Sequence, residues 1–253
     1  MGRSLKLSSF VALLRRAPRS AVEVALPRLT ELAPDFTPEQ RRLMARVRPY
    51  TMTSLERVAA LSQAVEYVVR ARIPGAITEC GVWKGGSMMV VALTLLAMND
   101  IRDLYLFDTF EGMTPPTDHD VTYAGVAATE LLESPTGRMR CDAEMDGVRR
   151  AIASTGYPMD RVHLVAGPVE NTLPDAAPEH LALLRLDTDF YSSTAHELAH
   201  LYPRLSEQGV LIIDDYGAWR GAKQAVDEYF HDQPVLLQRI DWTGRLVVKP
   251  PLR

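Results

Sequence analysis

The sequence predicts an α/β fold: a mostly parallel, seven-stranded sheet with an antiparallel C-terminal hairpin, preceded by N-terminal helices. Two observations support this fold class. From Pro74 onward, short apolar runs alternate with helix-like stretches, which is typical of parallel strands joined by crossover helices. Before residue 74 only helical patterns occur. We therefore expect a helical segment at residues 1–73, with lid or oligomer contacts, and a ligand-binding domain at residues 74–253.

Each element follows from its own pattern. Thr37 to Gln40 form a capping box that leads into a helix at residues 41–48, and apolar residues recur at helical spacing over residues 54–72. The expected strands are residues 76–82, 104–110, 162–166, 181–187, 209–214, 235–240 and 245–249. The other expected helices are residues 87–98, 142–154, 193–205 and 219–231. The stretch 112–140 is long for a connection inside a domain, which indicates a lid, a substrate loop or disorder.

Composition excludes several classes of protein. The 253 residues are 47% hydrophobic, and the net charge of −4 gives no reason to expect a nucleic-acid partner. Two cysteines are too few for a disulfide scaffold, so we expect a reducing cytosol. No apolar run approaches the roughly 18 residues of a membrane span. The basic residues before Glu23 indicate an amphipathic helix or a loose arm, with a weak surface anchor as the alternative.

Three acids follow two of the expected strands. Asp214 and Asp215 end one apolar run, and Asp187 ends another at residues 181–186. Ligands bind beyond the carboxyl ends of parallel strands, so the three carboxylates should meet in one crevice, where their mutual repulsion requires a cation. Oxygen ligands favour Mg²⁺, with Mn²⁺ as a second choice. Asp189 competes with Asp187 as the ligand, and a solvated turn or a helix cap is the simpler explanation for an Asp pair alone.

A glycine-containing turn follows the first expected strand and opens a helix. Its ligand-binding candidates are Glu79, Gly81, Gly85, Gly86 and Ser87. Trp83 stands where a dinucleotide fingerprint needs glycine, and an acid here would repel a pyrophosphate but suit a positive amine. Asp108, which ends the second strand, can bind the hydroxyls of a ribose. The combination favours S-adenosylmethionine, whereas the glycines alone would indicate no more than a tight turn.

On these motifs the chain resembles the macrocin O-methyltransferase (TylF-type) family. The matching stretches span roughly residues 50–235 and are residues 79–86, 108–112, 186–194, 201–205 and 212–216. The resemblance implies a Rossmann-like class I methyltransferase fold, with Glu79, Gly81 and Asp108 on the cofactor. It also implies that magnesium binds Asp187, Asp214 and Asp215. Further cofactor contacts that the resemblance implies are Thr51, Thr53, Gly167, Pro168 and Val169.

Members of that family methylate sugar hydroxyls of macrolides and aminocoumarins, and a mycobacterial relative acts on a polysaccharide. The resemblance therefore implies magnesium-dependent transfer of a methyl group to a sugar hydroxyl of a glycosylated natural product or polysaccharide. It does not extend to residues 112–140 or to the first 45 residues, where acceptor and oligomer contacts would lie. We expect a small-molecule or oligosaccharide acceptor and a homodimer or higher homo-oligomer.

The number of coordination positions on magnesium narrows the range of possible acceptors. Magnesium takes about six oxygens, so three carboxylates leave room for a vicinal diol and one water. Asp187 is the preferred base, with His119 and His196 as alternatives of better unperturbed pKa. Three other functions remain open at this point: methylation of a phenolic or catechol pair, a nicotinamide-dependent oxidoreductase, and a binding protein without turnover.

Overall fold

The computed structural model describes residues 35–134 and 141–251, so the basic N-terminal arm and part of the expected loop lie outside the described residues. Contacts divide the chain into two units, residues 1–41 and 42–253. Helix α3 (Pro38–Val47) begins with the expected capping box. The backbone N–H of Thr37 donates to Gln40 Oε1 (2.9 Å), and that of Gln40 donates to Thr37 Oγ1 (3.2 Å). The division of function at residue 73 stays a prediction.

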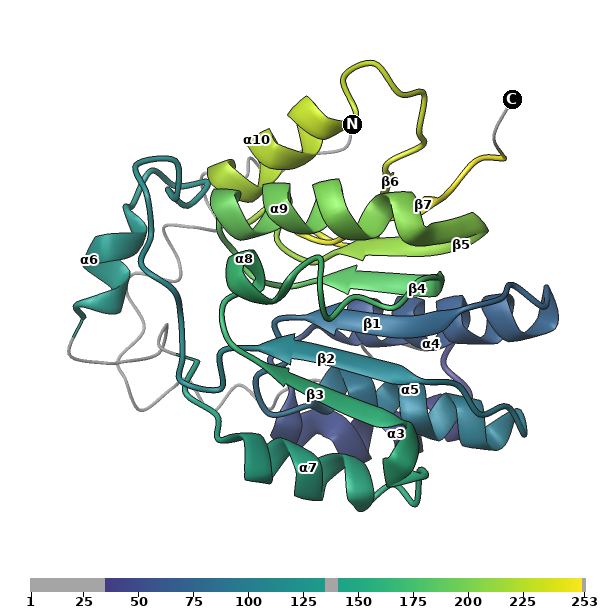
Figure 1. Cartoon of the computed structure of the whole chain (residues 1–253). Helices are drawn as coiled ribbons and strands as arrows, with labels where there is room; N and C mark the ends of the chain where they lie inside the picture. Colours follow the sequence, from purple (N-terminus) through teal and green to yellow (C-terminus); the bar gives the residue numbers. More distant parts are fainter. Residues whose placement is uncertain (1–34, 135–140, 252–253) are drawn as a thin grey trace, which may run out of the picture. The chain divides into compact units, whose positions relative to one another are not determined.

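The sheet confirms the expected fold class. In the described part of the chain it has seven strands in the order β3-β2-β1-β4-β5-β7-β6 (Figure 1). The strands are β1 (Ala76–Cys80), β2 (Leu104–Asp108), β3 (Val162–Ala166), β4 (Leu181–Leu186), β5 (Leu205–Ile213), β6 (Gln238–Arg239) and β7 (Arg245–Val248). The first five are parallel, and β7 pairs antiparallel with both β5 and β6. The C-terminal hairpin thus forms the edge that the sequence predicts.

The helices cover both faces of the sheet (Figure 1). Those on one face are α4 (Leu55–Arg70), α5 (Gly86–Ala97) and α7 (Met145–Ala153). Those on the other are α8 (Val169–Thr172), α9 (Tyr191–Leu201) and α10 (Arg220–Tyr229). A short α6 (Ala128–Leu132) interrupts the expected substrate loop. Among the described helices, none combines the length and apolarity that a membrane span needs.

The strand β5 differs most from its expected bounds, because it starts at Leu205 rather than at residue 209. The helix predicted to reach Leu205 ends at Leu201 and continues as a 3₁₀ turn, Tyr202–Arg204. Pro203 explains this end, since proline cannot stay in a helix interior. The early part of β5 is irregular: Gln208 has φ +62°, and the register against β4 shifts between Leu181 and Leu183.

The order of the strands determines where a ligand can bind. β1 pairs with β2 on one side and with β4 on the other, so the chain adds β2 and β3 on one side of β1 and then crosses to β4 and β5 on the other. Such a switch point opens a crevice at the carboxyl ends of the strands. The core beneath is tightly buried, with Phe107, Leu184 and Ile213 at most 1% exposed. The turns that carry the expected ligands therefore stand on a rigid sheet.

Candidate functional site

A pocket of about 250 Å³ lies at the switch point, beyond the ends of β1, β2, β4 and β5. Most of the residues predicted from sequence line it, namely Thr51, Thr53, Gly81, Gly86, Ser87, Asp108, Gly167, Pro168, Val169, Asp187, Asp214 and Asp215. Glu79 and Gly85 do not line it, and neither do His119 or His196. The fold thus brings the expected cofactor turn and the expected metal ligands into one cavity.

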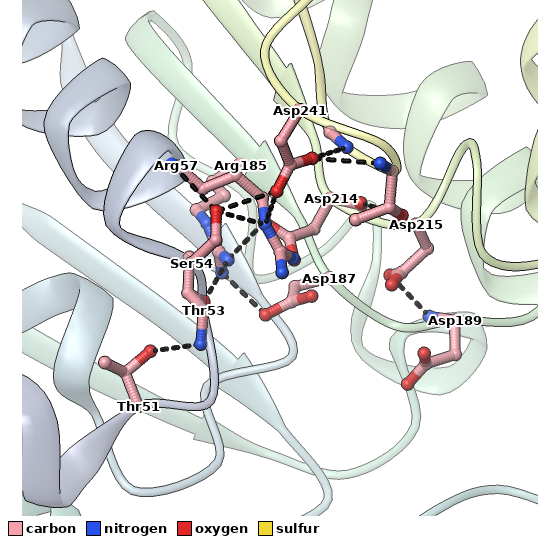
Figure 2. Close-up of polar contacts among 12 residues, drawn as sticks. Thr51, Thr53, Ser54, Arg57, Arg185, Asp187, Asp189, Asp214, Asp215 and Asp241 are labelled. Carbon is pink, nitrogen blue, oxygen red and sulfur yellow. Dashed lines mark hydrogen bonds and ion pairs between the residues drawn. The ribbon is translucent and has the colours of Figure 1, made fainter. Parts of the chain in front are cut away.

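The acids after β4 and β5 converge in this pocket. Asp187, Asp214 and Asp215 each offer a carboxylate oxygen, and the three atoms lie within 4.8 Å of one another. Asp189 is not a member of this cluster: its carboxylate accepts from the indole Nε1 of Trp219 at 2.6 Å, and its backbone N–H donates to Asp215 at 3.1 Å. Figure 2 shows Asp189 apart from Asp187. Of the two competing acids, the geometry therefore favours Asp187.

Arg185, which sequence reasoning missed, is the charged centre of the cluster. It lies in β4 with a 3% exposed side chain, and one guanidinium nitrogen donates to Glu79 (2.5 Å) and Asp187 (2.7 Å). The other donates to Asp214 at 2.6 Å and to the Thr53 hydroxyl at 3.2 Å. Because a charged residue in a buried strand needs partners, an arginine inside an apolar run was the signal that could have predicted this network.

A second cation approaches from α4. The Arg57 guanidinium donates to the Asp214 carboxylate, and its Nε donates to Asp241 at 3.0 Å (Figure 2). The Ser54 hydroxyl, which also caps α4, donates to the same Asp241 oxygen at 2.7 Å. Asp214 thus accepts from one arginine at each oxygen, and the turn at Asp241 is tied to the start of α4.

The electrostatics of the cluster fit a divalent cation. Burial raises the pKa of Asp187 well above its usual range; Arg185 opposes this shift, and the charges of Asp214 and Asp215 add to it. Burial also raises the pKa of Asp215, and its acidic neighbours add to that shift. The three carboxylates share two arginines, which also pair with Glu79 and Asp241, so these arginines do not balance the acids. A hard cation would relieve the repulsion, and three convergent carboxylates are a donor set suited to Mg²⁺.

The glycines of the β1–α5 turn allow close backbone approaches. Gly81 has φ +81°, and a Cβ there would lie 2.0 Å from the Asp187 carbonyl oxygen. At Gly86, a Cβ would lie 2.5 Å from the carbonyl oxygen of Tyr50. These two glycines let the chain segments that carry Asp187 and Thr51 close against the turn. These glycines thus do more than leave room for a ligand, because they also allow the backbone segments that carry the expected ligand-binding residues to pack closely.

Asp108 also holds this turn. Its carboxylate accepts from the backbone N–H groups of Val82 (2.6 Å), Trp83 (2.9 Å) and Phe110 (2.8 Å). Trp83 has φ +47° and Phe110 has φ +56°, backbone conformations that residues other than glycine rarely adopt. Asp108 lines the pocket where a ribose contact is expected, and it stabilises the turn in the same position.

Glu79 is buried below the pocket instead of lining it. Burial raises its pKa to about 7, although Arg185 opposes the shift. One of its oxygens accepts from Arg185, and the other has no partner in the described part of the chain. Gly85, with φ +85°, precedes α5 and packs towards Val148. Direct contact of either residue with a cofactor stays a prediction.

The histidines lie elsewhere. His119 is exposed, stacks on Tyr191 at 4.5 Å between ring centroids and contacts Gln224. His196 contacts the Leu173 carbonyl and the ring of His200. Their positions favour Asp187 over either histidine as the base. The loop after β2 instead adds Met113 and Thr114 to the pocket wall, and Cys141 lines it from the described chain that resumes there.

Comparisons with known proteins find similarity to O-methyltransferases. The family model described as macrocin-O-methyltransferase (TylF) matches residues 26–249, a longer stretch than the motifs alone indicate. A tetracenomycin-C 4′-O-methyltransferase that acts on a dimethoxy-rhamnosyl compound, from Streptomyces olivaceus, is 38% identical over 78% of this chain and 73% of its own length. The mycinamicin III 3″-O-methyltransferase of Micromonospora griseorubida is 35% identical over 71% and 70%, respectively. The solved structure of the O-methyltransferase NovP superposes with a TM-score of 0.70 at 31% identity, covering 80% of this chain and 83% of that one.

Proposed function

The chain belongs to the macrocin O-methyltransferase (TylF) family and is an S-adenosylmethionine-dependent O-methyltransferase, and we propose that it methylates a sugar hydroxyl with the help of magnesium. The acceptor is a sugar with two neighbouring hydroxyls in a glycosylated natural product or a polysaccharide. One observation carries this proposal: three convergent carboxylates share a pocket with the glycine turn.

The cofactor would occupy the side of the pocket formed by the β1–α5 turn. Asp108 at the end of β2 would hold the ribose, and Gly167 to Val169 after β3 would approach the adenine. The Glu79 carboxyl group, with one oxygen unpartnered among the described residues, leaves a hydrogen-bond acceptor beneath the turn for the amine of the cofactor. Asp187, Asp214 and Asp215 would hold the metal.

Two bound groups supply the chemistry: a sulfonium methyl for in-line displacement, and a Lewis acid that makes a hydroxyl more acidic. The chain's own residues position the reactants. Arg185 donates to Asp187 at 2.7 Å and so orients that carboxylate, which is 28% exposed on the pocket side. Asp187 accepts the proton of the acceptor hydroxyl. Phe107 and Val169 are buried and add apolar surface to the pocket wall, which excludes water there.

The relatives support a sugar acceptor, and the donor set alone supports the vicinal diol. Three carboxylates leave about three of the six magnesium positions, which suits a vicinal diol. The relatives named above act on mycinamicin III and on a tetracenomycin-C compound with a 2,3-dimethoxy-rhamnosyl group, which has no free 2,3-diol. For this chain, we further propose that it acts in the cytosol as a homodimer or higher homo-oligomer. Sedimentation velocity can test the oligomeric state.

Methyl transfer from labelled S-adenosylmethionine to methyl α-L-rhamnopyranoside tests the proposal. We expect turnover that EDTA abolishes and Mg²⁺ restores. Turnover of the 2,3-di-O-methyl rhamnoside should be at least about a hundredfold slower, because this sugar lacks the 2,3-diol. Equal turnover on the blocked sugar, or turnover that EDTA does not change, would refute the proposal. Faster methylation of 3,4-dihydroxybenzoate in the same assay would support the phenolic alternative instead.

A further inference from the structure

Three large apolar side chains are exposed around the acid cluster. Met52 is 58% exposed, Tyr123 67% and Trp242 54%, and we call these three residues the apolar rim. They come from three separate segments: the stretch before α4, the loop after β2 and the turn between β6 and β7. Single exposed apolar residues are common, but a group of them beside a cavity marks an interaction surface.

Trp242 is fixed beside a proposed metal ligand. The hydroxyl of its neighbour Thr243 donates to the Asp214 carbonyl at 2.7 Å, and the Gly217 N–H donates to the Thr243 carbonyl at 3.0 Å. A Cβ at Gly217 would lie 2.1 Å from the Trp242 carbonyl oxygen, so the two backbones are in direct contact. The indole is therefore exposed on a backbone that does not move independently of the acid cluster.

Tyr123 is held in the same way. Its N–H donates to the carbonyl of Ala218, whose own N–H donates to the Asp215 carbonyl at 3.0 Å. The Tyr123 and Trp242 rings meet edge to face, with centroids 5.6 Å apart and planes at 66°. Edge-to-face packing supports the pair while most of the surface of each ring stays open to solvent.

Met52 joins the rim to the cofactor side. It lines the pocket between Thr51 and Thr53. The nearby Ser54 hydroxyl bonds Asp241, which precedes Trp242 in the chain. Met52 thus lies in the pocket wall, and the turn that carries Trp242 is bonded to the start of α4 beside it. The three rim side chains carry no charge that would attract an ionic partner.

We propose that the apolar rim binds the aglycone of the acceptor, a flat and apolar ring system attached to the sugar that enters the pocket. This inference rests on the proposed function, because it places the sugar at the acid cluster and the remainder of the acceptor next to it. Aromatic side chains that are exposed and held in place stack on flat rings at little conformational cost. The rim thereby selects glycosides with a ring-shaped aglycone over free sugars.

Calorimetry tests the proposal on the full chain with S-adenosylhomocysteine and Mg²⁺ present. The probes are methyl α-L-rhamnopyranoside and its 4-methylumbelliferyl counterpart, which share a sugar and differ in the aglycone. We expect the aromatic glycoside to bind about tenfold more tightly, and the Tyr123→Ala/Trp242→Ala double variant to lose that preference. Trp242→Phe retains an aromatic ring and should keep most of the preference for the aromatic glycoside. Ile101→Ala, which removes another exposed apolar side chain, is the matched control and should change nothing.

Several outcomes would overturn the proposal. Equal affinity of the wild type for both probes, no binding of either probe, or a preference that survives in the double variant would each contradict it. Dissociation of an oligomer by the double variant in sedimentation velocity would show that the rim is covered by a second copy. The proposed function fails separately, if the wild type shows no magnesium-dependent methylation of the methyl glycoside.

Discussion

Arg57 and Asp214 form an ion pair that links the start of α4 to the end of β5. Their side chains are 13% and 3% exposed, so the pair is shielded from solvent. Arg185 approaches the other oxygen of Asp214, and Arg57 also reaches Asp241. Two arginine side chains therefore hold Asp214, which we propose also binds a metal cation. This arrangement explains how the acids stay together in a folded chain before any metal binds.

Replacement of Arg57 should destabilise the metal-free protein. Arg57→Gln leaves Asp241 without its cation and Asp214 with Arg185 alone, so we expect the free energy of unfolding to fall by about 2–3 kcal/mol. Mg²⁺ should reduce this loss, since it supplies positive charge to the same acids. Urea unfolding with EDTA or Mg²⁺ measures both values. Arg70→Gln, which removes a 74% exposed partner of Glu66, should cost less than about 0.5 kcal/mol; equal losses for the two variants would contradict the account.

Gly81 should tolerate no side chain. Gly81→Ala combines a left-handed φ with a Cβ that would meet the Asp187 carbonyl, so we expect a loss of about 3 kcal/mol or more. Gly156 is the matched control, because it has φ +86° and an added Cβ there would have no neighbour within 4 Å. Gly156→Ala should cost only about 1–2 kcal/mol. Chemical denaturation of both variants isolates the cost of the close approach, and similar values would show that the backbone around Asp187 can yield.

Asp120 should anchor the loop after β2. It is 1% exposed, and its carboxylate accepts from the Tyr191 N–H at the start of α9 (2.8 Å) and from the N–H and hydroxyl of Thr117 (2.6 and 2.8 Å). Asp120→Ala should lower the free energy of unfolding by about 1–2 kcal/mol, because the first N–H of α9 loses its carboxylate acceptor. Limited proteolysis should cut the variant faster between residues 111 and 133. The exposed neighbour Asp118 serves as the control, and a cleavage rate equal to that of Asp118→Ala would argue against an anchoring role.

Cys141 should be a poorly reactive thiol despite lining the pocket. Burial raises its pKa to about 12, and the charges of Asp189 and Asp187 add to the shift. A raised thiol pKa lowers the thiolate fraction at any given pH, so at pH 8 alkylation should be about a thousandfold slower than for a free cysteine. The rate should rise about tenfold per pH unit up to pH 11. Iodoacetamide labelling against a Cys141→Ser control measures this, and fast labelling at pH 8 would contradict it.

Those features that depend on local periodicity could be predicted from sequence. The five parallel strands, the edge hairpin and the capping box at Thr37 follow from apolar runs and turn residues. The convergence of Asp187 with Asp214 and Asp215 also followed, because parallel strands end at the same side of a sheet. These predictions needed no knowledge of side-chain contacts.

The residues that sequence reasoning missed act through contacts between distant segments. Arg57 and Asp241 lie 184 positions apart and meet only because α4 packs beside the C-terminal turn. Asp120 reaches Tyr191 across 71 positions. No local pattern encodes such pairs. Arg185 is different, since a charge inside an apolar run is visible in the sequence and indicates buried partners.

The central claim is that Asp187, Asp214 and Asp215 bind a divalent cation, and calorimetric titration of the metal-free chain with Mg²⁺ tests it most directly. We expect one ion per chain, at least about tenfold weaker affinity in Asp187→Asn and in Asp215→Asn, and no methylation by Asp187→Asn even at saturating Mg²⁺. Asp189→Asn is the matched control, and it should bind the ion like the wild type. No binding by the wild type, or normal affinity and turnover in Asp187→Asn, would contradict the account.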